Sequence, residues 1–245
     1  MQQLIIDIGN SSSKIALFEG NTLIESSRVE HEALCQLLTE KASDRAIQAA
    51  IVSSVIPLNE EMERAIKELP YPCLHMSARL RMPFTTAYKT PDTLGPDRLA
   101  AVAGACYQQP DRDLLVIDIG SAITYDMLTA GGTYIGGNIS PGIGMRFKAL
   151  NLFTGRLPLV DKEGERMAIG NTTIAAIREG VLQGVDKEIE GYIEEYTKKY
   201  PNLLIFLTGG GTFLLDNRVK SRTFVDNLLV AKGLNRILML NNEAI

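Results

Sequence analysis

Two short segments of the chain combine an acidic residue, a glycine and small polar residues in the same order. In the first, Asp7 follows an apolar run and precedes Gly9 and a polar stretch that ends at Lys14, and in the second, Asp118 follows a similar run and precedes Gly120. A glycine lets the backbone approach a phosphate closely, and N–H groups and hydroxyls of a turn can donate to phosphate oxygens. A carboxylate can hold Mg²⁺ through its water shell. The matched pair predicts two turns that hold a phosphate chain across a cleft, although the first turn alone is also compatible with an ordinary hairpin rich in Asn and Ser.

A third chemical candidate lies at Gly95, Pro96, Asp97 and Arg98, where a helix is expected to begin. Proline at the first helical position and an acid in the first turn have a structural explanation in capping and the helix dipole. Arg98 does not fit that explanation, because cations are disfavoured at this end of a helix. An Asp base beside an Arg that holds an anion would explain both side chains, and the spacing leaves the two interpretations open.

Two further glycine-rich turns precede expected helices, at residues 136–142 and 208–211. Each indicates a close approach of the backbone, either to a ligand or to another part of the protein, and adenosine is a plausible ligand of the second turn. The chain lacks the Gly-x-Gly-x-x-Gly fingerprint after its first strand and also lacks a Gly-Lys-Ser/Thr phosphate loop. Both of these common nucleotide-binding folds are therefore disfavoured.

The elements around these residues form one plan that occurs twice. In the first half we expect strands over residues 4–8, 14–18, 22–25 and 49–52 and helices over residues 31–41, 59–69 and 99–107. At an offset of 111 residues, a second Asp-Ile-Gly strand at 115–120 is followed by another Gly-containing turn and another strand. Helices at 142–153 and 171–200, a strand at 203–207 and another helix directly after the turn at 208–211 complete the second half.

This repetition predicts an α/β fold made of two duplicated halves, residues 1–112 and 113–245, each with a β-sheet flanked by helices. A polar link at 110–113 separates them. A chance coincidence of strand and turn chemistry is the alternative.

Composition narrows the class of protein. The chain has 245 residues with 25 Lys and Arg against 29 Asp and Glu, and no basic block of the kind that nucleic-acid binding needs. Its three cysteines show no metal-ligand or redox spacing, which fits a reducing compartment. The sequence shows neither a signal peptide nor an apolar run of membrane-spanning length. We expect a soluble cytoplasmic protein with no nucleic-acid or membrane partner.

Together, the segments from Asp7 to the glycine-rich turn at 208–211 resemble the type III pantothenate kinase family in order and spacing. These bacterial enzymes begin coenzyme A synthesis, and they belong to the actin-like and hexokinase-like superfamily, whose halves have a ribonuclease H-like fold with a cleft between them. The resemblance implies transfer of the γ-phosphoryl group of ATP to the primary hydroxyl of pantothenate, giving 4'-phosphopantothenate. It also implies a homodimer, Mg²⁺ with the ATP, and a monovalent cation, K⁺ or NH₄⁺.

The resemblance also implies a role for each matching residue. The ATP-binding residues would be Asp7, Ile8, Gly9, Asn10, Ser11, Ser12, Ser13, Lys14 and Ser121. The pantothenate-binding residues would be Tyr88, Gly95, Pro96, Asp97, Arg98 and Thr173, with Asp97 as the catalytic base. Asp118 would bind K⁺, and Asp7 would hold Mg²⁺ through water.

The sequence departs from the family pattern at three positions: Ser11 and Ser121 stand where the family usually has Thr, and Pro96 stands where it commonly has Ala. None of these changes removes a chemical group that the reaction needs, so activity is expected. Two other interpretations remain open, a non-catalytic regulator that kept the fold and a kinase of the same superfamily that acts on a sugar or another carboxylate.

Overall fold

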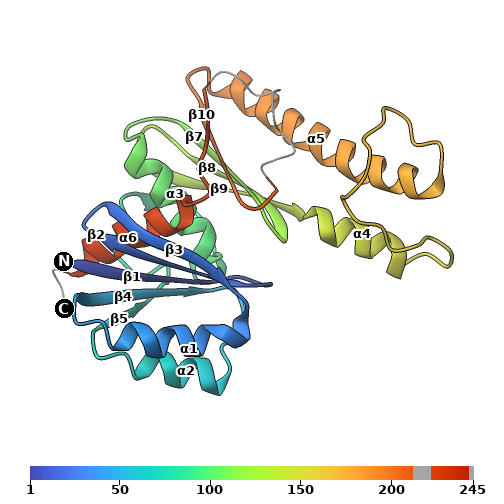
Figure 1. Cartoon of the computed structure of the whole chain (residues 1–245). Helices are drawn as coiled ribbons and strands as arrows, with labels where there is room; N and C mark the ends of the chain where they lie inside the picture. The colour runs from blue at the N-terminus through green and yellow to red at the C-terminus, as the bar shows by residue number, and fades with distance from the viewer. Residues whose placement is uncertain (212–221, 243–245) are drawn as a thin grey trace. The chain divides into compact units, whose positions relative to one another are not determined.

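The computed structural model describes residues 1–211 and 222–242 and divides into two compact units (Figure 1). The first unit contains Met1–Asp111 and Leu128–Gly136 and continues from Leu228 onward. The second contains Arg112–Met127 and Gly137–Asn227. In the described part of the chain, no helix is both long and apolar enough to span a membrane.

The first unit is built on a five-stranded mixed sheet in the order β3-β2-β1-β4-β5. Its strands are β1 (Gln2–Ile8), β2 (Ser13–Glu19), β3 (Thr22–Val29), β4 (Ile47–Ser54) and β5 (Cys73–His75). The first three strands form an antiparallel meander, and β4 lies parallel to both β1 and β5. Positive φ at Gly20 allows the tight turn between β2 and β3.

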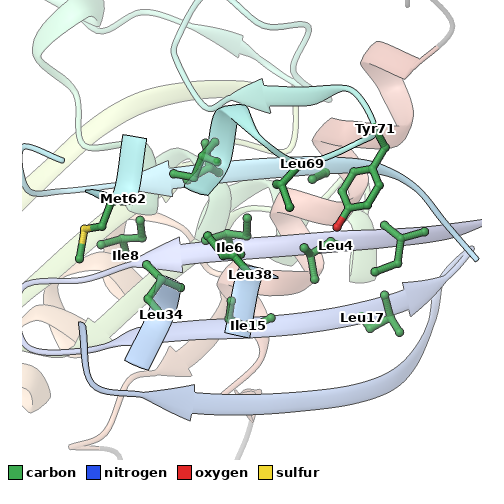
Figure 2. Packing of buried hydrophobic residues seen from close by; sticks show 14 residues of the cluster. Leu4, Ile6, Ile8, Ile15, Leu17, Leu34, Leu38, Met62, Leu69 and Tyr71 are labelled. Carbon is green, nitrogen blue, oxygen red and sulfur yellow. The ribbon is translucent and has the colours of Figure 1, made fainter. Parts of the chain in front are cut away.

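One face of this sheet carries the main core of the first unit. Because side chains alternate between the two faces of a strand, Leu4, Ile6 and Ile8 all point to the same side. There they pack against leucines of α1 (His31–Ala42) and apolar residues of α2 (Glu60–Lys67), as Figure 2 shows. Helix α2 begins after Asn59, whose side chain accepts a hydrogen bond from the backbone N–H of Met62 at 2.8 Å.

Two closely packed helices, α3 (Pro96–Gln108) and α6 (Leu229–Asn242), lie against strands of the same sheet. Glycines make their close approach possible, because a side chain at Gly104 would collide with the backbone of Leu229, and one at Gly233 with the backbone of Ala100. Asn235 of α6 donates to the carbonyl oxygen of Gly20 at 2.8 Å and so ties the helix to the β2–β3 turn.

The other sheet has six strands in the order β11-β10-β7-β8-β9-β6. They are β6 (Thr85–Thr86), β7 (Leu114–Ile119), β8 (Ala122–Leu128), β9 (Thr133–Pro141), β10 (Leu204–Thr208) and β11 (Thr223–Val225). The core of the second unit joins β7, β8 and β10 to α5 (Thr173–Lys199), through residues such as Ile117, Tyr125, Val185 and Ile205. A smaller cluster around Phe147 joins α4 (Ile143–Leu152) to α5.

The α/β prediction is confirmed, because the protein has two mixed sheets flanked by helices. The expected strands and helices appear near their expected bounds, and the helix expected after the turn at 208–211 falls outside the described residues. The sequence analysis missed β5, β6, β11, the 3₁₀ turn Pro91–Thr93 and α6. Strands of two or three residues carry no periodic signal, whereas the buried positions of α6 recur every three or four residues and could have been recognised.

Candidate active site

The first acidic turn connects β1 to β2 through residues 9–12. It is closed by a backbone hydrogen bond from Gly9 N–H to the carbonyl oxygen of Ser12 at 3.1 Å. Asp7 is half-buried at the end of β1, while Asn10 and Ser11 are exposed at the tip of the turn. The tip therefore presents backbone and small polar side chains to any ligand that approaches it.

Two side chains from the following segment hold the base of this turn. Arg28 donates from Nε to Oγ of Ser12 at 2.7 Å, and Oγ of Ser13 lies 3.1 Å from Nδ1 of His31. Ser12 and Ser13 are both buried. Eight residues of this segment are predicted to bind ATP. In two of them, Ser12 and Ser13, the hydroxyl already forms a hydrogen bond within the protein.

A polar row crosses the first sheet beside this turn. The strand register pairs Asp7 with Ser53 on β4 and with Lys14 on β2, and it pairs Lys14 with Arg28 on β3. Directly paired residues point to the same face of a sheet. The row therefore places a carboxylate between a hydroxyl on one side and two cations on the other.

The oxygen atoms of this row suit a hydrated cation. The hydroxyl of Ser53 is fully buried and has no hydrogen-bond partner within residues 1–211 and 222–242. An unsatisfied buried hydroxyl is costly, so a water or a ligand atom beside Asp7 would stabilise it. In the described ranges no three His, Cys, Asp or Glu residues come together as a metal cage. One carboxylate with water and phosphate oxygens is the mode in which Mg²⁺ usually binds at nucleotide sites.

The second acidic turn is shorter than the first. Only Gly120 and Ser121 connect β7 to β8, and Gly120 N–H donates to the carbonyl oxygen of Ala122 at 3.0 Å. Both connecting residues are exposed, and Asp118 at the end of β7 is half-buried. On β10, Thr208 is paired with Asp118, just as Ser53 is paired with Asp7.

Glycines of the second unit from both glycine-rich segments lie against this turn. Gly142 N–H donates to the carbonyl oxygen of Ser121 at 3.1 Å, and Gly211 N–H donates to that of Ile119 at 3.0 Å. A side chain at Gly142 would collide with the Ser121 carbonyl, and one at Gly209 would collide with the carboxylate of Asp118. Gly209 also has a φ of 93°, a conformation that favours glycine. The sequence predicted that the backbone of residues 208–211 lies close to a ligand or to another part of the protein. In the structure this backbone lies against the second acidic turn.

Residues 136–142 have three different contacts, which the sequence left unresolved. Gly136 lies under the ring of Tyr88, where an added Cβ would be 3.4 Å from Cδ2. Gly137 leaves no room for a side chain beside the backbone of Tyr125, and Gly142 lies against Ser121. The segment therefore reaches both a predicted pantothenate residue and a predicted ATP residue.

The predicted substrate residues of the first unit lie on α3 and next to β6. Helix α3 begins after Gly95, with Pro96 at its first position and Asp97 in its first turn. A Cβ at Gly95 would lie 2.6 Å from Oδ1 of Asp97, so the carboxylate folds back over this glycine. Arg98 is buried, with 5% of its surface exposed. The structural role in helix initiation is confirmed, and the role as a catalytic base stays a prediction.

Thr173 is exposed at the first position of α5. The preceding residue, Thr172, caps the helix by accepting from Ala175 N–H at 3.2 Å. Gly170 lies so close to the backbone of Ala176 that a side chain there would collide with it. The chain is therefore folded tightly onto the helix just before Thr173.

Each unit thus assembles its own set of predicted residues. In the first unit, the sheet places Asp7 beside Lys14, and Tyr88 and the α3 start belong to the same unit. In the second unit, Asp118 and Ser121 share one turn with the glycines at 142 and 209. Sequence reasoning missed Arg28 and Ser53, which only the strand register brings next to Asp7. That both acidic turns hold one ligand stays a prediction.

The three cysteines are partly buried thiols. Cys35, Cys73 and Cys106 are all free. Burial raises the pKa of Cys73 to about 11, and burial also raises the pKa of Cys35 and of Cys106. Burial therefore disfavours the thiolate form at each of these cysteines.

Comparisons with known proteins give a consistent result. A family model described as type III pantothenate kinase matches residues 3–195. The chain is 47% identical over 240 residues to the type III pantothenate kinase of Phocaeicola vulgatus, covering 98% of this chain and 99% of that protein. It is 48% identical over 242 residues to the type III pantothenate kinase of Bacteroides fragilis, covering 99% of each.

Solved structures share the fold. A Campylobacter jejuni structure described as a "conserved putative Baf family transcriptional activator" matches with a TM-score of 0.64 and 25% identity, covering 98% of this chain and 99% of that one. A Listeria monocytogenes structure described as a "putative N-acetylmannosamine kinase" matches with a TM-score of 0.58, covering 99% and 100% of the two chains. Its identity of 14% shows a common fold alone.

Proposed function

Because the chain belongs to the type III pantothenate kinase family, we propose that it transfers the γ-phosphoryl group of ATP to the primary hydroxyl of pantothenate. The product would be 4'-phosphopantothenate, and the reaction would be the first step of coenzyme A biosynthesis. The observation that carries the proposal is the match to pantothenate kinases over 98% of the chain, at 47% identity. The activity would be cytoplasmic and would involve no nucleic acid or membrane.

The two acidic turns would bind the phosphates of ATP. The first offers the exposed tip at Asn10 and Ser11, with Lys14 in the row beside Asp7. The second offers Ser121 together with the start of α4, where no side chain of the part of the chain that the structure describes caps the N–H groups of the first helical turn. Free N–H groups at a helix N-terminus favour an anion. Phosphoryl transfer asks the protein mainly for this kind of positioning and charge stabilisation.

Cations would complete the phosphate site. Asp7, with the unsatisfied hydroxyl of Ser53 beside it, would hold Mg²⁺ through water, and Asp118 would hold K⁺ or NH₄⁺. When bound, these cations supply positive charge to the phosphate oxygens. If Asp118 holds the monovalent cation, Asp118→Asn should need more K⁺ for half-maximal activity, and an unchanged K⁺ titration would exclude this role.

Pantothenate would bind at the start of α3 and beside β6. Asp97 would accept the proton of the primary hydroxyl as the γ-phosphoryl group is transferred, and Arg98 would hold the carboxylate of pantothenate. Tyr88, Gly95, Pro96 and Thr173 would complete the substrate site. Tyr88 is already oriented by its packing on Gly136 and by the ring of Tyr134, 6.1 Å away between centroids.

Replacement of the proposed base tests this assignment. Asp97→Asn should keep the fold, because the helix start keeps a side chain of the same size, and should lower turnover at least about 100-fold. Circular dichroism would establish the fold, and a coupled ADP-release assay with pantothenate would measure turnover. Normal turnover in Asp97→Asn would remove Asp97 as the base.

A regulator without kinase activity is the second candidate, because the Campylobacter relative is described as a transcriptional activator. The presence of Asp7, Asp97, Arg98 and Asp118 favours the enzyme, since binding alone does not require a base. The same ADP-release assay, run with pantothenate and with a panel of sugars, separates the candidates. ADP release with pantothenate alone supports the proposal, release with a sugar supports another kinase, and no release supports the regulator.

The active form would be a homodimer. Phe153 at the end of α4 is 81% exposed and Ile169 in the loop before α5 is 84% exposed, so large apolar side chains of the second unit face solvent in a single chain. Exposed apolar surface of this kind is typical of association sites. Light scattering should give a dimer for the wild type and a smaller dimer fraction for Phe153→Ser.

A further inference from the structure

Three side chains of the second unit converge on one carboxylate, that of Glu188 in α5. Tyr125 on β8 donates to Oε1 at 2.7 Å, and Ser140 on β9 donates to the same oxygen at 2.5 Å. Arg146 on α4 donates to Oε2 at 2.5 Å. The three elements that follow the second acidic turn in the chain, β8, β9 and α4, thus each send a hydrogen-bond donor to the same carboxylate.

The carboxylate is ionised in this setting. Burial alone would raise the pKa of Glu188, but hydrogen bonds from Ser140, Arg146 and Tyr125 outweigh burial and lower that pKa. Burial and the bond to Glu188 raise the pKa of Tyr125, whose hydroxyl therefore stays a donor. Charge-assisted hydrogen bonds of this kind are about twice as strong as neutral ones and fix geometry.

Arg146 connects this carboxylate to the corner between β9 and α4. Its Nε donates to the carbonyl oxygen of Pro141 at 2.7 Å, and its Nη2 also reaches Oγ of Ser140 at 3.2 Å. The guanidinium thus joins two consecutive residues of the corner to α5. Because its donors are held in a rigid plane, it fixes the direction in which the chain leaves β9.

The next residue after this corner touches the second acidic turn. Gly142 N–H donates to the carbonyl oxygen of Ser121 at 3.1 Å, with no space for a side chain between them. An unbroken line of contacts therefore runs from Glu188 through Arg146 and Pro141 to Ser121. A shift of the corner would move Gly142 and, with it, the carbonyl of Ser121.

We propose that Glu188 is a positioning residue for ATP, which acts through Arg146 and the β9–α4 corner to hold Ser121 in its binding position. Part-buried ion pairs add little net stability, because desolvation offsets most of their attraction. The ion pair between Glu188 and Arg146 therefore contributes mainly by fixing the positions of the groups that it joins. The inference rests on the proposed function, because the binding of ATP by Ser121 is part of that proposal.

Helix α5 offers a comparison within the same element. Glu179 is a carboxylate that is more deeply buried than Glu188 and also has a lowered pKa, and Arg166 and Gln183 donate to it. Gln183 lies one turn further along α5, whereas Arg166 belongs to the loop before the helix, as does Met167, whose N–H also donates to Glu179 at 3.0 Å. Glu179 thus resembles Glu188 in chemistry and differs in what it holds, which makes it a matched control.

The test is a set of substitutions at Glu188 with separate KM values for the two substrates. Glu188→Ala should raise the KM for ATP about tenfold, the effect of losing hydrogen bonds to a charged group. The KM for pantothenate should change less than about twofold. Glu188→Gln keeps the shape and one acceptor oxygen and should restore part of the loss. Ser140→Ala, a milder change in case Glu188→Ala does not fold, should raise the KM for ATP about threefold.

Two controls separate positioning from general stability. Glu179→Ala should lower the melting temperature and leave the KM for ATP unchanged. Glu194→Ala removes the same charge from an exposed position of α5, where Glu194 pairs with Lys198, and should change neither quantity. A drop in melting temperature for Glu188→Ala without a rise in the KM for ATP would overturn the proposal, and so would equal rises in both KM values.

Calorimetric titration with ATP alone keeps the inference distinct from the proposed function. If the wild type does not phosphorylate pantothenate but Glu188→Ala still binds ATP about tenfold more weakly, the proposed substrate fails and the positioning role stands. If the wild type phosphorylates pantothenate and Glu188→Ala binds ATP as tightly as the wild type, the positioning role fails. If the wild type binds no ATP, both fail.

Discussion

Each half of the chain has three consecutive strands that begin with an Asp-Ile-Gly strand. The two sets have the same overall length, but their turns differ in length. In the first, β1 connects to β2 through the four residues 9–12, and β2 connects to β3 through Gly20 and Asn21. In the second, β7 connects to β8 through Gly120 and Ser121, and β8 connects to β9 through the four residues 129–132. The middle strands β2 and β8 both have seven residues. Because the first turns differ by two residues, β8 begins two positions earlier than the sequence repeat, with its offset of 111 residues, would place it.

This difference changes how each turn is held. The longer first turn is stabilised by side chains, through the bonds of Arg28 to Ser12 and of His31 to Ser13. The shorter second turn is stabilised by the backbone of distant segments, at Gly142 and Gly211. The two turns therefore resemble each other in sequence but are stabilised by different kinds of contact. We infer that the geometry of the first turn depends on side chains and that of the second on backbone contacts with distant segments.

One feature is common to both hairpins. The strand parallel to each acidic strand pairs a buried hydroxyl residue with the Asp, Ser53 with Asp7 and Thr208 with Asp118. These pairs lie outside the repeat found in the sequence. They support the proposal that residues 1–112 and 113–245 arose by duplication.

The largest expected effect on stability and ATP binding comes from a side chain placed beside Asp118. Gly209→Ala places a methyl group against the carboxylate and forces Ala to a φ of 93°. We expect a loss of about 3 kcal/mol in the free energy of unfolding, measured by urea denaturation, and no detectable ATP binding. Gly210→Ala is the control, because a Cβ at Gly210 would meet no atom of the described residues within 4 Å. Equal stability of the two variants would show that the second turn does not depend on this contact.

The next effect comes from the other glycine at the second turn. Gly142→Ala should displace the carbonyl of Ser121 and raise the KM for ATP at least about tenfold, because displacements of about 1 Å are costly in such sites. Gly144→Ala lies two residues further along, in the first turn of α4, where an added Cβ would meet no atom of residues 1–211 and 222–242 within 4 Å. It should leave the KM unchanged and stabilise the protein by about 0.5–1 kcal/mol. A normal KM in Gly142→Ala would argue against backbone support of the second turn.

A smaller effect is expected at the first turn. Arg28→Ala removes the bond to Ser12 and one cation from the polar row, so ATP should bind about fivefold more weakly in calorimetry. Arg45→Ala removes the same charge from an exposed position of the first unit and should have no effect. If both variants weaken ATP binding equally, the affinity depends on the net charge of the first unit. The hydrogen bond from Arg28 to Ser12 would then have no specific role in ATP binding.

The smallest effect concerns the two serines that stand where the family usually has threonine. Ser11→Thr and Ser121→Thr keep the hydroxyl at exposed positions, so the KM for ATP should change less than about twofold. Ser121→Ala removes the hydroxyl and should raise that KM about fivefold. A large effect of Ser121→Thr would mean that the short second turn has no room for a methyl group.

The sequence predicts well what depends on local patterns. Apolar runs identify β1 and β7, and Gly95 and Pro96 correctly mark the start of α3. Contacts between distant segments carry no such local signal. Ser53 next to Asp7 depends on strand register, Gly209 against Asp118 depends on the path after β10, and the line from Glu188 to Ser121 crosses three elements. These contacts arise only when the sheets form.

The central claim is that both acidic turns hold the phosphates of one ATP molecule. A crystal structure with a non-hydrolysable ATP analogue, Mg²⁺ and pantothenate tests it most directly. The account predicts phosphate oxygens about 3 Å from backbone N–H groups of both turns, near Gly9 and near Gly120, with the pantothenate hydroxyl beside Asp97. A triphosphate bound by one turn only, with the other turn open to solvent, would contradict it.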